Sequence, residues 1–130
     1  MTRRQAREEA FILIFEKQFN DSPLSEILEL ATEIRDIEPD DYMKDTFYGV
    51  YDNLEKIDGI ISDNAVGWNI DRISKTALAV LRLSIYEMLY RDDIDPAVSI
   101  NEAVEILKKY ATDMDAKYVN GILSSVNKAS

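Results

Sequence analysis

The sequence has 130 residues, of which 46% are hydrophobic, and this is enough for one domain with a real core. It contains no cysteine and no histidine, which excludes disulfides, thiolate metal sites, cysteine nucleophiles and Ser-His-Asp triads. Apolar runs are too short to cross a membrane, and no signal-peptide pattern opens the chain. We therefore expect a single cytoplasmic domain over residues 1–130 that makes no membrane contact.

The excess negative charge lies in one part of the chain. The formal net charge is −10 at pH 7, and residues 20–66 carry three basic and thirteen acidic side chains. Residues 1–19 have a net charge of +1 and residues 67–130 a net charge of −1. The middle segment would repel a nucleic acid, whereas either flank could accept one.

Apolar residues recur at steps of three and four throughout, and glycine and proline are scarce, which predicts an all-α fold of about seven helices. The expected helices cover residues 3–19, 24–36, 43–66 with a break near 52–53, 77–90, 99–110 and 113 onward. The helix over residues 77–90 is apolar on nearly every side, so we expect it at the centre of the fold.

Several residues mark expected helix ends. Ser22 before Pro23 is typical of an N-cap followed by the first helical position, and Ser74 is a candidate cap for residues 77–90. Ser99 and Glu102 have the spacing of a capping box.

Other residues are expected to pack in the interior. Arg82 lies in the central helix and needs a carboxylate or carbonyl partner there. Trp68 and Arg72 are expected to plug the space between two halves of the protein. Gly121, inside the last helix, is expected to mark a close contact between helices.

Acidic residues give little support for catalysis. The pairs Asp40/Asp41 and Asp92/Asp93 lie in predicted turns, where carboxylates cap helices and stay solvated. A carboxylate di-iron site would need Glu-x-x-His steps, which a chain without histidine cannot supply. No glycine-rich phosphate loop is present. We expect no catalytic residue, no metal and no cofactor.

Arg3, Arg4 and Arg7 fall within an arc of about 100° at the start of the first helix. The helix dipole disfavours cations there, while a guanidinium binds phosphate bidentately and stacks on exposed bases. The alternative is ordinary solvated surface beside Glu8 and Glu9. Replacing the three arginines by alanine is expected to weaken RNA binding with little change in melting temperature. Internal ion pairs at all three guanidinium groups would contradict the hypothesis that these arginines bind a polyanion.

Two aromatic features have alternative interpretations. Phe11, Phe15 and Phe19 lie four residues apart, which favours core packing but also permits a stripe that receives a partner protein. Tyr118 could cover the core with its hydroxyl in water, or stack on a base or a partner side chain. The lysines close to it in sequence are Lys108, Lys109 and Lys117.

Three sequence blocks in fixed order extend over nearly the whole chain. They are residues 3–8 continuing to Ala10 and Phe15, then Trp68 and Arg72 leading into residues 80–87, and finally residues 100–105 with residues 117–123. The Ile-Asn-Glu-Ala and Val-Asn-Gly segments of the last block are the most specific. Together these blocks resemble the NusB family of bacterial transcription antitermination factors.

The resemblance implies two small helical bundles that share a core, and a role that is not enzymatic. It implies binding of boxA RNA together with NusE, a small-subunit ribosomal protein. That complex would join other Nus factors on RNA polymerase and promote read-through in ribosomal RNA operons. The family's RNA contact maps to Arg3, Arg4 and Arg7, and partner contacts are carried over to Phe15 and Tyr118.

A chain with a net charge of −10 cannot hold RNA strongly by its own field, so a basic partner should tighten binding. An alternative function is an acidic helical protein-interaction module that never binds RNA. NusB-like domains also occur fused to RNA cytosine methyltransferases, but a chain ending at Ser130 has no room for a cofactor domain. The phenylalanine stripe would also permit a homodimer.

Overall fold

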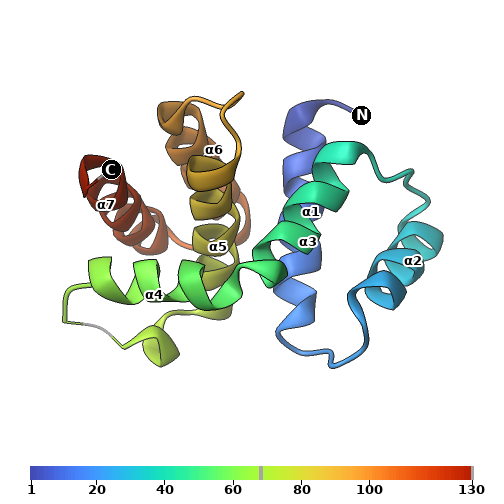
Figure 1. The fold of residues 1–130 in the computed structure, drawn as a ribbon, viewed down its shortest axis with the longest axis horizontal. Helices are drawn as coiled ribbons and strands as arrows, with labels where there is room; N and C mark the ends of the chain where they lie inside the picture. The colour runs from blue at the N-terminus through green and yellow to red at the C-terminus, as the bar shows by residue number, and fades with distance from the viewer. Residues whose placement is uncertain (68, 130) are drawn as a thin grey trace.

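The computed structural model describes residues 1–67 and 69–129, which form seven α-helices and one short 3-10 helix and contain no strand (Figure 1). The elements are α1 (Arg3–Lys17), α2 (Leu24–Arg35), α3 (Asp41–Asp52), α4 (Leu54–Asn64), η1 (Ile70–Arg72), α5 (Lys75–Tyr90), α6 (Pro96–Tyr110) and α7 (Asp113–Ala129). The predicted all-α fold with seven helices is confirmed.

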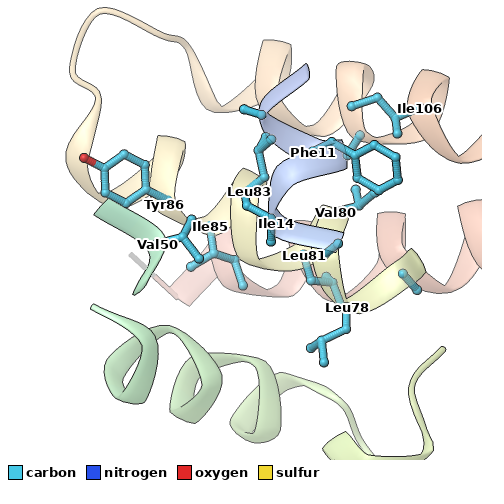
Figure 2. Packing of buried hydrophobic residues seen from close by; sticks show 14 of the residues in the cluster. Phe11, Ile14, Val50, Leu78, Val80, Leu81, Leu83, Ile85, Tyr86 and Ile106 are labelled. Carbon is cyan, nitrogen blue, oxygen red and sulfur yellow. The ribbon is translucent and has the colours of Figure 1, made fainter. Parts of the chain in front are cut away.

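Helix α5 is the centre of the structure. Ten of its sixteen residues are buried, and it packs against α1, α3, α4, α6 and α7. Figure 1 shows α1, α2 and α3 on one side of the molecule and α4 to α7 on the other, so two small bundles share the core that α5 supplies. In Figure 2 Leu81, Leu83 and Ile85 of α5 lie near Ile14 of α1, deep in this core.

The predicted break in the long helical segment is confirmed at Asn53. Helix α3 ends at Asp52 and α4 begins at Leu54. Asn53 leaves the helical conformation, and both its backbone N–H and its side-chain amide donate to the Gly49 carbonyl. The predicted cap at Ser74 is also confirmed, because its hydroxyl accepts from the backbone N–H of Ala77 over 3.1 Å.

Two other predicted caps are wrong. Pro23 itself is the N-cap residue of α2, and no side chain caps that helix. Helix α6 begins at Pro96 and is capped by the Asp95 carboxylate, so Ser99 lies inside the helix rather than before it. An Asp-Pro pair satisfies both the cap and the first helical position, and it takes precedence over the later serine.

The predicted close contact at Gly121 is also wrong. A Cβ atom built there would have no neighbour within 4 Å. Gly49 is the glycine that a neighbour approaches, since its Cβ would lie 2.2 Å from the Cε1 atom of Tyr86. The close packing therefore joins α3 to α5.

Arg82 of α5 meets Asp58 of α4 in two parallel hydrogen bonds of 2.9 Å, which confirms that it needed a carboxylate partner. Of the expected plug, Trp68 lies outside the described residues, while Arg72 is exposed at the end of η1, so the prediction that it fills the space between the two halves is wrong. No helix in residues 1–67 and 69–129 is both long and apolar enough to cross a membrane.

Candidate nucleic-acid interface

The first turn of α1 is held by a capping box. The Thr2 hydroxyl accepts from the backbone N–H of Gln5 over 3.1 Å, and the Gln5 side chain accepts from the Thr2 N–H over 2.8 Å. No acidic residue lies in this turn. The capping box therefore places Arg3 and Arg4 at the N-terminus of α1, which is the positive end of the helix dipole.

Arg7, one turn later, lies inside the protein with 3% of its surface exposed. Its Nε donates to Oε2 of Glu87 over 2.7 Å, and Glu87 is fully buried. The same carboxylate accepts from the Tyr42 hydroxyl and, over 2.7 Å, from the Ser99 hydroxyl. One buried carboxylate on α5 thus ties together α1, α3 and α6.

Burial and the charge of Glu87 together determine the protonation states of Arg7 and Tyr42. Burial lowers the pKa of Arg7, but the hydrogen bond and charge of Glu87 outweigh it and raise the pKa above the ordinary value. Burial, together with the neighbouring Glu87, raises the pKa of Tyr42 far above its usual range. Arg7 is therefore charged and Tyr42 neutral, the states in which both donate to Glu87.

Arg3 and Arg4 point to solvent, unlike Arg7. The Arg4 side chain is 72% exposed, and its Nε and NH2 groups both donate to Glu102 of α6, at 3.2 and 3.0 Å. Arg3 is 44% exposed and lies 3.8 Å from Asp93. Its guanidinium also stacks over the Tyr42 ring, 4.7 Å from the ring centroid.

The structure therefore separates the three arginines that the sequence placed in one arc. Each makes an ion pair, but only the pair of Arg7 is internal, and its guanidinium is not available to a phosphate. The expectation of one exposed three-arginine cluster needs correction at Arg7, whose observed role is to join helices. Arg3 and Arg4 remain predicted RNA contacts.

A groove of about 410 Å³ runs beside Arg4 between α1 and α6. Its charged lining residues are Arg4, Arg7, Glu8, Glu102, Glu105, Lys108 and Lys109. Burial alone would raise the pKa of Glu8. Hydrogen bonds from Lys109 and Tyr110 outweigh burial, so the pKa of Glu8 lies below its ordinary value. The three carboxylates of this groove thus offset most, but not all, of the charge of its four basic side chains.

The phenylalanine stripe changes from core to surface between α1 and the turn that follows it, where Phe19 lies. Phe11 is buried and contacts the ring of Tyr110 of α6, with centroids 5.2 Å apart. Phe15 is half-buried and contacts both Phe11 and Phe19, and Phe19 is 64% exposed. Core packing, the favoured interpretation, holds for Phe11, while the end of the stripe at Phe19 reaches solvent.

Tyr118 lies elsewhere, on α7. It is half-buried and lines a pocket of about 200 Å³ with Ile73, Ala77 and the exposed Met114. Burial raises the pKa of Tyr118 above its ordinary value. The two residues predicted to bind a partner, Phe15 and Tyr118, therefore belong to different helices and to different surface features.

The acidic residues whose carboxylates accept hydrogen bonds from the arginines were not identified from the sequence. Glu87 interrupts an otherwise apolar helix, and a buried carboxylate of this kind signals a buried cationic partner. Nothing in the sequence selects Arg7 as that partner, because 80 residues separate the two. The spacing between Ser99 and Glu102 predicts a helix cap, but the structure shows Glu102 accepting hydrogen bonds from Arg4 instead. Within residues 1–67 and 69–129 no group of three acidic residues is arranged to hold a metal.

Comparison with known proteins gives consistent matches over the whole chain. The family model described as the NusB family matches residues 4–128. The transcription antitermination protein NusB of Ruminiclostridium cellulolyticum is 43% identical over 130 residues, covering 98% of this chain and 90% of that protein. The NusB protein of Listeria monocytogenes is 41% identical, covering 97% of this chain and 96% of that protein.

Two solved structures are similar in fold as well as sequence. Thermotoga maritima NusB superposes with a TM-score of 0.86 at 36% identity, covering 98% of this chain and 92% of its own. A NusB chain crystallised with NusE and double-stranded RNA gives a TM-score of 0.88 at 28% identity, covering 100% of both chains.

Proposed function

Because the chain belongs to the NusB family of transcription antitermination proteins, we propose that it binds boxA RNA together with NusE and promotes read-through in ribosomal RNA operons. The observation that carries the RNA part is the exposed pair Arg3 and Arg4 at the capped start of α1. The similar NusB chain that was crystallised with NusE and double-stranded RNA supports both partners.

Arg3 and Arg4 are the proposed RNA contacts. Both guanidinium groups reach solvent, and a guanidinium can bind a phosphate through two parallel hydrogen bonds. Arg7 contributes indirectly, because its buried pair with Glu87 fixes the orientation of α1 and hence the direction in which Arg3 and Arg4 point. We assign it a positioning role.

NusE would supply the positive charge that this chain lacks. The net charge of −10 opposes the approach of a polyanion, and phosphate neutralisation provides most nonspecific affinity for RNA. Phe15, with the exposed Phe19 beside it, and Tyr118 on α7 are the proposed protein-binding residues. The assembled complex would act with other Nus factors on RNA polymerase in the bacterial cytoplasm.

The test is a titration of labelled boxA RNA with this protein alone and with NusE present. We expect weak binding alone and much tighter, boxA-selective binding with NusE; equal affinities would contradict the proposal. The variant Arg3→Ala/Arg4→Ala should weaken binding in the complex. The matched control is Lys75→Ala/Lys128→Ala, which removes two exposed charges from α5 and α7, away from the start of α1.

The alternative function, an acidic interaction module without RNA binding, has its own outcome in the same experiment. It would be favoured if the protein bound an immobilised basic partner and RNA had no effect on that complex. The excess acidic charge of residues 20–66 is the feature that such a partner would recognise.

A further inference from the structure

The two exposed arginines, Arg3 and Arg4, differ in how closely their guanidinium groups are bound by acidic side chains of the protein itself. Arg3 lies 3.8 Å from Asp93, and Asp93 makes shorter bonds of 2.8 and 3.0 Å to Arg91. Arg4 instead makes three hydrogen-bond contacts of 3.0–3.2 Å with the two oxygens of Glu102. A phosphate can reach Arg3 without removing a close partner, but at Arg4 it meets a carboxylate in the place that it would take.

Glu102 is held in position to make this contact. It lies on α6, its side chain is only 15% exposed, and its Oε1 is also 3.8 Å from NH1 of the buried Arg7. The second, fixed cation keeps Glu102 at the edge of the groove when Arg4 moves. The flexible partner of the pair is therefore Arg4, whose side chain is 72% exposed.

We propose that Glu102 acts as an internal competitor for Arg4, so that RNA gains this phosphate contact only by displacing the carboxylate. Glu102 occupies the edge of the Arg4 guanidinium formed by Nε and NH2, so a phosphate that binds this edge through two parallel hydrogen bonds must displace the carboxylate. The Arg4–Glu102 pair lowers the affinity of the protein for any single-stranded RNA.

The consequence is a threshold on RNA binding. A ligand that offers one or two phosphates gains little binding affinity from Arg4, because it must first break the salt bridge between Arg4 and Glu102. A ligand held by several contacts at once, as boxA with NusE would be, can displace Glu102. The cost of displacing Glu102 is the same for every ligand that takes this contact, so a weakly held RNA is left largely unbound while a ligand held by several contacts stays bound.

The experiment compares Glu102→Gln with Glu105→Gln. Both substitutions remove one negative charge from α6 and keep the side-chain size. Glu105 influences Arg4 only through its charge, and its own ion-pair partner is Lys108 at 3.7 Å. Because Glu102 also lies 3.8 Å from Arg7, the same comparison in an Arg4→Gln background isolates the direct contact between Glu102 and Arg4.

We expect Glu102→Gln to bind an unrelated single-stranded RNA roughly tenfold more tightly than Glu105→Gln, about 1.4 kcal/mol. The slope of log affinity against log salt should steepen by about 0.7, the value for one added phosphate contact on a single strand. In an Arg4→Gln background the two variants should bind equally. Their melting temperatures should be similar, because the Arg4 end of the pair is exposed and the buried Arg7 keeps Glu87 as its close partner.

Equal binding by Glu102→Gln and Glu105→Gln would overturn the inference, and so would weaker binding by Glu102→Gln, which would make Glu102 a positioning residue for Arg4. This inference rests on the proposed RNA-binding function, and the two fail differently. If wild-type protein with NusE does not bind boxA, the proposed function fails. If boxA binds but the two variants behave alike, only the role of Glu102 fails. Absence of RNA binding by every variant would overturn both.

Discussion

Arg7 of α1 and Glu87 of α5 form a buried ion pair in which Nε donates to Oε2 over 2.7 Å. The Glu87 carboxylate also accepts from Tyr42 and Ser99, so its four hydrogen bonds come from three different helices. The pair is therefore an organising contact between the two bundles, and it determines how α1 presents its exposed arginines.

Arg7→Ala should destabilise the protein by about 3–5 kcal/mol, because it leaves the Glu87 carboxylate buried and without its cation. Chemical denaturation followed by circular dichroism measures this free energy of unfolding. Arg4→Ala is the control, and it should change stability little because the Arg4 side chain is exposed. Equal stability of Arg7→Ala and Arg4→Ala would contradict the structural role of Arg7.

Ser99→Ala should cost about 1–3 kcal/mol, since it removes one donor from a fully buried carboxylate. The matched control is Ser125→Ala, which removes an exposed hydroxyl that donates to Asn64 over 2.7 Å. The control should lose much less stability in the same denaturation experiment. If Ser99 acted as a helix cap, its loss would fray α6 and lower the helical signal before global unfolding.

The fold was predictable because helix periodicity is local, whereas the site depends on contacts between distant residues. Spacing alone locates the central helix and the break at Asn53. Spacing also puts Arg3, Arg4 and Arg7 on one face, but Arg7 is far enough along α1 to be buried where α1 packs against α3 and α5. Only the position of Glu87, 80 residues away, shows which arginine is buried. The wrong cap at Ser99 has a different cause, because the Asp95-Pro96 pair that begins α6 is a local signal, and only the bond from Ser99 to Glu87 depends on distant residues.

Two glycines should respond in opposite ways to alanine. At Gly49 the new Cβ would lie 2.2 Å from the Tyr86 ring, and that ring is buried and anchored by a hydrogen bond to Asp45. Gly49→Ala should therefore destabilise by about 1–3 kcal/mol through overpacking. Gly121→Ala should stabilise α7 by up to about 1 kcal/mol, because the site is open and alanine is the better helix former. Thermal unfolding measures both, and equal shifts of the melting temperature would contradict the structure.

The protein should lose stability in alkaline solution as its buried tyrosines ionise. Burial raises the pKa of Tyr51 and of Tyr86 to about 12, and that of Tyr42 lies higher still, while an unfolded tyrosine titrates at 10.0. The folded state holds these protons more tightly, so their stabilising contribution is complete below about pH 10 and is lost as the pH rises from there.

Urea unfolding measured at a series of pH values, together with tyrosinate absorbance, tests this dependence. Unfolding and the appearance of tyrosinate from these residues should coincide above about pH 10. Tyr51→Phe should be less stable at neutral pH, because the Ile14 carbonyl loses its 2.8 Å donor, but its stability should fall less steeply with pH. Constant stability through this range, or full tyrosinate absorbance from a protein that is still folded, would contradict the burial of these hydroxyl groups.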